Sequence, residues 1–328
     1  MDLNPYQLDF ILQKTGAKSA TAEQSVQTLW SGYGEITRFA LKGCDRNSLI
    51  VKHIAPPLNA HHPRGWNSNL SHERKLKSYQ VEINWYRNWS KLCSKSSYVP
   101  QCFGITSEKG EILILLEDLD AIGFDSRFNT LNQENLQACL RWLAHFHACF
   151  MQHEPIGLWP VGTYWHLDTR PEEWDAMEDS PLKKAAKEIN AKLNQCQFKT
   201  IVHGDAKVAN FCFSSNDNSV AAVDFQYAGG GCGMKDVAYF LGSCLSGTEC
   251  DLYQDDYLNY YFSSLKKALA KAGNGVDCTA IENEWRQLYP LAWADFNRFL
   301  LGWSPNHKKL NRHSSNMTQL ALQQLQKA

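Results

Sequence analysis

The sequence predicts an α+β protein with two lobes, a small β-rich amino-terminal lobe and a larger, mainly helical carboxy-terminal lobe. Three observations support this prediction. Short runs of β-branched and other apolar residues concentrate before residue 118, and helical 3-4 spacing of apolar residues prevails after it. The chain of 328 residues is also long enough to bury two separate cores.

In the amino-terminal third, the first thirty residues carry helix-like apolar spacing. Two strands are expected at residues 34–41 and 48–54, joined across a turn rich in Gly, Asp and Asn. A polar, proline-containing stretch (residues 55–71) should be irregular, and a helix should then continue to Trp89. A second hairpin is expected around Lys109-Gly110, and its second strand is nearly all apolar and should therefore be buried.

The remainder is expected to be mostly helical. A buried helix face is predicted by apolar residues at 3-4 spacing, namely Leu136, Cys139, Leu140, Leu143, Ala144, His147 and Phe150. His145 and His147 face different directions on this helix and are interpreted as structural rather than as metal ligands. Short strands are expected at residues 199–202, 210–214 and 219–223. The glycine-rich residues 228–235 do not fit a P-loop and are expected to form a flexible loop.

Polar residues beside these short strands predict the chemistry. Asp205 lies in the loop after the first strand, Asn210 begins the second, and Asp224 follows the third. Transfer of a phosphoryl group from ATP to an alcohol needs a carboxylate that orients and deprotonates the alcohol, and oxygen ligands that hold Mg²⁺. Asp205 is the candidate base, and Asn210 and Asp224 are the candidate Mg²⁺ ligands. A turn near Asp217 would place Asn210 roughly opposite Asp224. His203 is expected to support the loop by hydrogen bonding.

The pattern His203-Gly204-Asp205, then Asn210, then a strand and Asp224-Phe225 resembles the kinase-like phosphotransferases. This superfamily includes aminoglycoside phosphotransferases, choline kinases and the ecdysteroid kinase-like family. The resemblance implies a two-lobed protein-kinase-like fold, ATP as phosphoryl donor and Mg²⁺ as cofactor. Lys207 departs from the aminoglycoside enzymes, which commonly have His there. It stands where many protein kinases have a lysine that touches the transferred phosphate, and is a second candidate catalytic residue.

The same resemblance implies nucleotide-binding residues upstream. Lys52, in the expected strand 48–54, matches the lysine that binds the α and β phosphates, and Glu82 on the next helix matches its ion-pair partner. Glu117 and Leu119 lie in the expected hinge, where backbone groups bind adenine. This places the nucleotide-binding lobe at residues 1–118 and the catalytic and acceptor-binding lobe at residues 119–328. The resemblance also implies that Asp236 braces the catalytic loop through backbone N–H groups.

The acceptor class is predicted from the short connection between Asp224 and Asp236. Protein kinases use a longer segment there to dock a peptide, so a small-molecule alcohol is expected. Aromatic residues of the helical region could hold the acceptor or belong to the core: Trp159, Tyr164, Trp165, Trp285, Trp293 and Trp303. Acidic residues at 249, 251, 255 and 256 could attract an amine but more simply form the solvated start of a helix. A protein kinase, an adenylyltransferase and a non-catalytic nucleotide-binding regulator are the alternatives.

Composition agrees with a soluble enzyme. The net charge of −1 gives no global field for nucleic acid or a membrane surface, so neither is expected as a partner. No apolar run is long enough to span a bilayer, and the first residues lack a signal segment. The 11 cysteines are scattered singly and favour reduced thiols over disulfides or a zinc site. A cytoplasmic location is expected.

Overall fold

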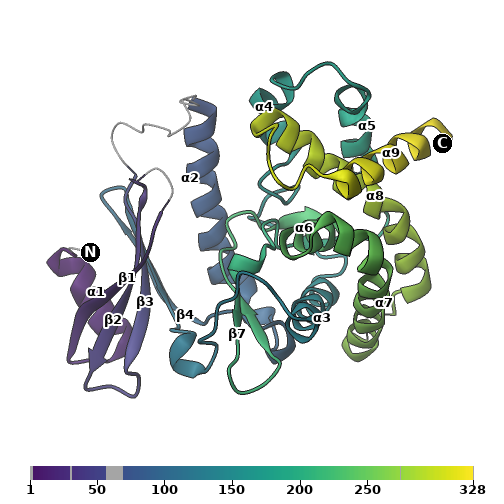
Figure 1. Cartoon of the computed structure of the whole chain (residues 1–328). Helices are drawn as coiled ribbons and strands as arrows, with labels where there is room; N and C mark the ends of the chain where they lie inside the picture. The colour runs from purple at the N-terminus through teal and green to yellow at the C-terminus, as the bar shows by residue number, and fades with distance from the viewer. Residues whose placement is uncertain (1–2, 30–31, 57–68, 274, 328) are drawn as a thin grey trace. The chain divides into compact units, whose positions relative to one another are not determined.

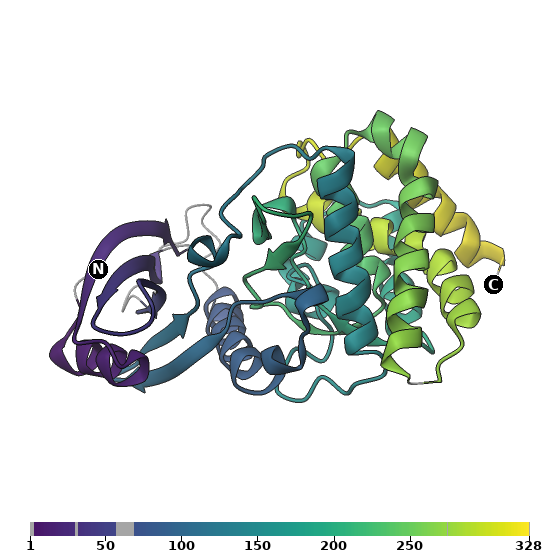
Figure 2. The ribbon, with the colours of Figure 1, turned by 90° about the horizontal axis from the view of Figure 1, so that it is seen from below.

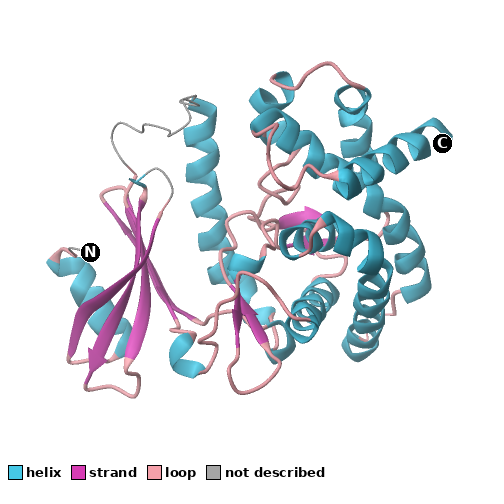
Figure 3. Ribbon diagram, viewed as in Figure 1, coloured by secondary structure: helices cyan, strands magenta, loops and turns pink. Residues whose placement is uncertain are grey.

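The computed structural model describes residues 3–29, 32–56, 69–273 and 275–327. The chain divides into two compact units. The first comprises Met1–Lys91, Val99–Ser126 and Ser214–Asp217, and the second comprises Leu92–Tyr98, Arg127–Phe213 and Asn218–Ala328. The long strands belong to the first unit and most helices to the second (Figure 1, Figure 3). The predicted α+β class, with a β-rich part followed by a helical part, is confirmed.

The first unit contains a five-stranded antiparallel sheet with the order β1-β2-β3-β5-β4. Its strands are β1 (Ser19–Thr28), β2 (Gly34–Lys42), β3 (Ser48–Ile54), β4 (Cys102–Glu108) and β5 (Glu111–Leu116). Both predicted hairpins are confirmed. Lys109 and Gly110 join β4 to β5 with φ angles of 51° and 85°, as a type I′ turn requires.

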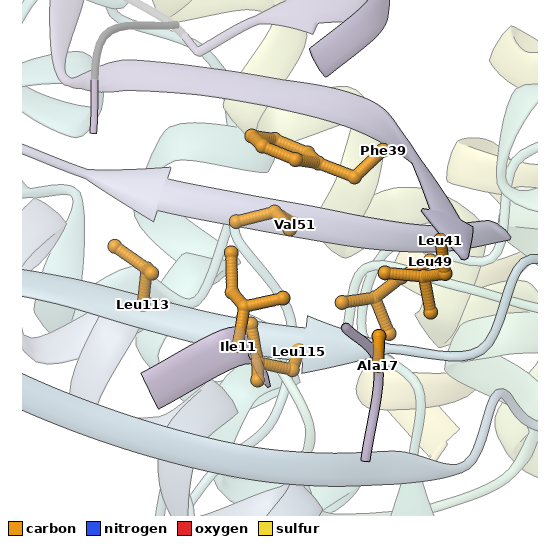
Figure 4. Packing of buried hydrophobic residues seen from close by; sticks show 8 residues of the cluster. All are labelled: Ile11, Ala17, Phe39, Leu41, Leu49, Val51, Leu113 and Leu115. Carbon is orange, nitrogen blue, oxygen red and sulfur yellow. The ribbon is translucent and has the colours of Figure 1, made fainter. Parts of the chain in front are cut away.

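The core of the first unit lies between one face of this sheet and helix α1 (Pro5–Thr15). Figure 4 shows Ile11 of this helix among side chains that come from alternate positions of β2, β3 and β5. Because successive strand residues point to opposite faces, Leu49 and Val51 enter this core while Lys52 points to the other face of the sheet.

The expectation of helix throughout the first thirty residues is wrong for residues 19–28, which form strand β1. This strand is at the edge of the sheet, and nine of its ten side chains are exposed. It therefore has no alternation of apolar and polar residues that could indicate a strand. Backbone pairing with β2, from Ser19 opposite Lys42 to Thr28 opposite Glu35, determines its conformation.

The predicted helix that ends at Trp89 is confirmed. Helix α2 (Asn69–Asn84) continues directly into a π-helical segment, Trp85–Trp89, and 3₁₀ turns follow at Ser90–Leu92 and Lys95–Ser97. Most of the stretch expected to be irregular, residues 57–68, lies outside the described residues.

The second unit is built mainly of helices. They are α3 (Gln133–Cys149), α4 (Pro171–Asp175), α5 (Pro181–Asn194), α6 (Met234–Cys244), α7 (Gly247–Ala272), α8 (Cys278–Trp303) and α9 (Arg312–Lys327). The buried face predicted for α3 is confirmed, and this helix lies beside α7 (Figure 1, Figure 2). None of the helices in the described ranges combines the length and the apolarity that a membrane span requires.

Two small antiparallel sheets complete the second unit. One pairs β6 (Thr200–Val202) with β9 (Gly229–Gly231), and the other pairs β7 (Phe211–Phe213) with β8 (Val220–Ala222). The expectation of a flexible loop at residues 228–235 is therefore wrong: Gly229–Gly231 form the buried strand β9, and Met234 already begins helix α6. Glycine is needed because the backbone of Trp159 runs against this strand, with hydrogen bonds of 3.1 Å to Ala228 and Gly230.

Two glycines of β9 provide a matched test of this close packing. A Cβ atom on Gly229 would lie 2.3 Å from the backbone oxygen of Trp159, whereas on Gly231 its nearest neighbour would be 3.5 Å away, an ordinary contact. We expect Gly229→Ala to lower the free energy of unfolding by about 1–3 kcal/mol. Gly231→Ala should change it by less than about 0.5 kcal/mol. Urea unfolding of both variants measures the difference, and equal stabilities would contradict the close approach.

Candidate active site

The candidate site residues fall into two groups. Lys52, Glu82, Glu117 and Leu119 belong to the first unit. Asp205, Lys207, Asn210 and Asp224 belong to the second. The geometry of each group is described within its own unit.

Lys52 of β3 and Glu82 of α2 form a buried ion pair. The Nζ atom of Lys52 lies 2.8 Å from Oε1 and 2.7 Å from Oε2 of Glu82, and the two residues are 3% and 1% exposed. The ring of Tyr79 lies 5.9 Å from the same Nζ atom. A buried charge is tolerated when a partner with good geometry compensates it. The ion pair expected from the sequence is present, and it holds the ammonium group of Lys52 in one position.

Residues 117–119 leave the end of β5, the strand next to β3. Between the two candidate hinge residues, the buried carboxylate of Asp118 accepts hydrogen bonds from Nε of Arg38 at 2.8 Å and from Oγ of Ser48 at 2.7 Å. The hydrogen bond to Asp118 raises the pKa of Arg38. The N–H of Glu117 donates to the carbonyl of Gln101, and the carbonyl of Leu119 accepts from the N–H of Phe124. The backbone of this segment is therefore fixed on both sides.

The loop after β6 is held by Asp236, the third residue of α6. Its carboxylate is fully buried and accepts from the N–H of His203 at 2.6 Å and from the N–H of Gly204 at 2.9 Å. Nε2 of His147 lies 3.1 Å from the same carboxylate, so α3 also contributes to this network. Gly204 has φ of 78°, and a Cβ atom there would lie 2.1 Å from the carbonyl oxygen of Tyr227. Only glycine fits this position.

His203 connects the two halves of the predicted motif. Its Nε2 lies 3.0 Å from the carbonyl oxygen of Val223, and the N–H of Asp205 lies 3.3 Å from its Nδ1. Because a carbonyl only accepts, Nε2 carries the proton and Nδ1 is the acceptor. The ring thus links Asp205 to the residue that precedes Asp224, and the supporting role predicted for His203 matches this geometry.

Three donors hold the carboxylate of Asp205. Tyr239 donates its hydroxyl to Oδ1 at 3.1 Å. Oδ2 accepts from Nζ of Lys207 at 2.9 Å and from Nδ2 of Asn210 at 3.1 Å. Asp205 is only 6% exposed, so these contacts determine the direction of its side chain.

Asn210 and Asp224 lie at the same end of the β7–β8 hairpin. Phe211 pairs with Ala222, and the N–H of Val223 donates to the carbonyl of Asn210 at 3.0 Å, so Asn210 is opposite Val223, one residue before Asp224. Nδ2 of Asn210 donates to the backbone carbonyl and the carboxylate of Asp205, so the amide oxygen Oδ1 is not used in these two hydrogen bonds. Asp224 has φ of 69°, a left-handed conformation that Asp adopts more readily than most residues. A carboxylate and an amide oxygen fit a hard cation such as Mg²⁺.

Lys207 is half-buried beside these carboxylates. Burial alone would lower its pKa, but the nearby carboxylates of Asp205 and Asp224 outweigh this effect and raise it. Lys207 therefore carries its charge at neutral pH.

Most of the aromatic residues considered for the acceptor belong to the core. Indole N–H groups of Trp159, Trp165 and Trp285 donate to Gln226, Asp295 and Phe198, and all three side chains are buried. Tyr164 and Trp303 are partly exposed. Tyr239 is not among the residues predicted from the sequence, although it lies one helical turn after Asp236 and this spacing could have indicated it. Burial raises its pKa, so its hydroxyl remains a donor to Asp205.

Comparisons with known proteins complete this description. A model of the ecdysteroid kinase-like family matches residues 47–155 and 163–274. Curated protein sequences give no match. Among solved structures, the chain is similar to the amicoumacin kinase hAmiN, in complex with AMP-PNP, Ca²⁺ and amicoumacin, with 15% identity, 97% of this chain and 93% of that chain covered, and a TM-score of 0.47. The chain is also similar to a putative fructosamine-3-kinase from Haemophilus somnus 129PT, with 13% identity, 96% of this chain and 95% of that chain covered, and a TM-score of 0.45. A third similar structure is the aminoglycoside phosphotransferase APH(3'')-Id from Streptomyces rimosus, in complex with ADP and streptomycin. Its identity is 14%, 89% of this chain and 100% of that chain are covered, and the TM-score is 0.42.

The network around Asp236 predicts a large loss of stability when its carboxylate is removed. Asp236→Ala leaves the buried N–H groups of His203 and Gly204 without their acceptor, at a cost of about 1–3 kcal/mol each in the free energy of unfolding. Asp168→Ala is the control, because that side chain is 74% exposed and its removal should cost less than about 0.5 kcal/mol.

Urea unfolding and amide hydrogen exchange at residues 203 and 204 measure the effect. If both variants were equally stable, or exchange at these two amides did not accelerate in Asp236→Ala, the bracing role would be refuted.

Proposed function

Because the chain belongs to the ecdysteroid kinase-like family, we propose that it is an ATP- and Mg²⁺-dependent O-phosphotransferase that phosphorylates a hydroxyl group of a small molecule. The family match includes every candidate site residue. The observation that carries the proposal is the carboxylate of Asp205, oriented by three donors in a braced loop beside Asn210 and the β7–β8 hairpin.

Asp205 is the proposed base. It orients the acceptor hydroxyl and takes its proton as the oxygen forms a bond to the γ-phosphorus and the bond between that phosphorus and ADP breaks. Tyr239 and Asn210 hold the carboxylate toward the acceptor. Lys207, charged and half-exposed, is proposed to contact the transferred phosphoryl group.

Asn210, through Oδ1, and Asp224, through its carboxylate, would hold Mg²⁺. When bound, the ion offsets the negative charge of the phosphates. The orientation of the Asn210 amide supports this assignment, since Asp205 engages the nitrogen and not the oxygen.

Lys52 is proposed to bind the α and β phosphates, with Glu82 fixing its ammonium group through both carboxylate oxygens. The backbone of Glu117 and Leu119 is proposed to bind adenine. Residues 1–118 would then form the nucleotide-binding lobe, and residues 119–328 the catalytic and acceptor-binding lobe.

A small-molecule acceptor is supported by the segment between Asp224 and Asp236. Within this segment, Gly229–Gly231 form strand β9, and helix α6 begins at Met234. This leaves little chain for docking a polypeptide.

The first test of the function identifies the product. Incubation with ATP, Mg²⁺ and a small-molecule extract of the source cells should yield a small molecule that gains the mass of one phosphoryl group. Asp205→Asn should lower kcat by about 10²–10⁴, because it removes the base, and leave the affinity for ATP nearly unchanged. Asp168→Asn, on an exposed side chain, should retain the rate.

Mass spectrometry and titration calorimetry distinguish the alternatives. A small molecule that gains an adenylyl group would indicate an adenylyltransferase. A polypeptide that gains a phosphoryl group, with no phosphorylated small molecule, would indicate a protein kinase. ATP binding without any turnover would indicate a regulatory protein.

The proposed metal ligand is tested by Asp224→Asn, because Asn also tolerates the left-handed backbone conformation at this position. We expect Mg²⁺-dependent turnover to fall at least about 100-fold while the melting temperature stays within a few degrees. Asp217→Asn, an exposed residue in the turn of the same hairpin, is the matched control. Unchanged turnover of Asp224→Asn at saturating Mg²⁺ would exclude Asp224 as a ligand.

A further inference from the structure

Lys309 lies beside the candidate base, although it is distant from it in sequence. It belongs to the segment that connects α8 to α9. Its Nζ atom lies 4.4 Å from the centroid of the Tyr239 ring and 5.3 Å from that of Phe296. The hydroxyl of the same Tyr239 donates to Asp205. The ammonium group of Lys309 and the carboxylate of Asp205 therefore contact the same tyrosine side chain.

Lys309 differs from the neighbouring cations because no carboxylate forms an ion pair with it among the described residues. Lys207 pairs with Asp205, Arg170 with Glu173, and Arg298 with Asp295. Burial lowers the pKa of Lys309 to about 8, and the charge of Asp205 opposes this shift. At neutral pH most of the molecules therefore carry a positive charge here, and this charge lies against the ring faces of Tyr239 and Phe296.

The surroundings of Lys309 are aromatic. Tyr164 packs against the ring of Tyr239 at 5.7 Å and against that of Phe299 at 5.4 Å, and Trp303 stacks on Phe299 at 5.6 Å. Tyr164 and Trp303 are partly exposed, so part of each aromatic side chain is accessible to a ligand. A flat apolar group and a negative charge complement this combination of residues.

We propose that the acceptor is a ring-bearing alcohol with an anionic group, whose hydroxyl meets Asp205 while its anionic group pairs with the ammonium of Lys309. The inference rests on the proposed function and specifies its substrate class. A polycationic acceptor would be repelled by both Lys207 and Lys309.

The test uses probes of defined charge. The series consists of 4-(hydroxymethyl)phenyl carboxylic acids with side chains of increasing length, each compared with its methyl ester, which keeps the ring and the hydroxyl but lacks the charge. Binding is measured by titration calorimetry with and without ADP. We expect the best acid to bind about tenfold more tightly than its ester, as one additional charge pair of modest strength provides.

Variants assign the preference to Lys309. Lys309→Met keeps most of the apolar stem and removes the charge, so the acid and its ester should bind equally. Lys309→Arg should keep the preference for the acid. Lys308→Met is the matched control, because the adjacent lysine is exposed, and it should behave like the unaltered protein.

The outcomes separate this inference from the phosphotransferase assignment. If no acid binds more tightly than its ester in the unaltered protein, or if Lys309→Met keeps the preference, the proposed acceptor class is wrong. An acid that binds through Lys309 but gains no phosphoryl group with ATP and Mg²⁺ would support the anion site and contradict its role in binding the acceptor, whereas the transfer reaction itself is judged by the product search with the cell extract.

Discussion

The buried carboxylate of Asp236 fixes the geometry of the loop on which the candidate active site depends. It accepts hydrogen bonds from the N–H groups of His203 and Gly204 and so holds a backbone turn. Only glycine fits position 204 of this turn. The turn directs the His203 ring toward Val223 and the N–H of Asp205 toward that ring. Two segments that are distant in sequence are therefore joined by hydrogen bonds, and a buried charge is stabilised by donors rather than by an ion-pair partner alone.

Strand β3 of the first unit combines two functions through the alternation of its side chains. Leu49 and Val51 fill the core beneath α1, and Lys52 points from the opposite face to Glu82. A shift of the strand register by one residue would exchange these faces and place the charge in the apolar core. The packing of the core therefore also determines where the ammonium group lies.

The sequence predicted the features that depend on local spacing, and it failed where distant contacts decide. The hairpins and the position of Asp205 follow from alternation, turn residues and motif spacing, whereas the pairing of Lys52 with Glu82 was implied by the resemblance to the kinase-like phosphotransferases. Strand β1 was missed because an exposed edge strand needs no apolar alternation. Strand β9 was missed because glycines usually indicate a loop, whereas here they admit the backbone of Trp159. Lys309 has no signal in its own neighbourhood, since its environment is created only when α6 and α8 pack together.

The buried Lys52 and the partly exposed Lys309 illustrate two ways of stabilising a cation. Glu82 neutralises Lys52 locally, so the pair fixes the position of the ammonium group. Lys309 is stabilised by the ring faces of Tyr239 and Phe296, a contribution of about 0.5–2 kcal/mol that removes no charge. Its electric field remains available to a ligand. An anionic group of the proposed acceptor would therefore pair with Lys309 without breaking an ion pair among the described residues.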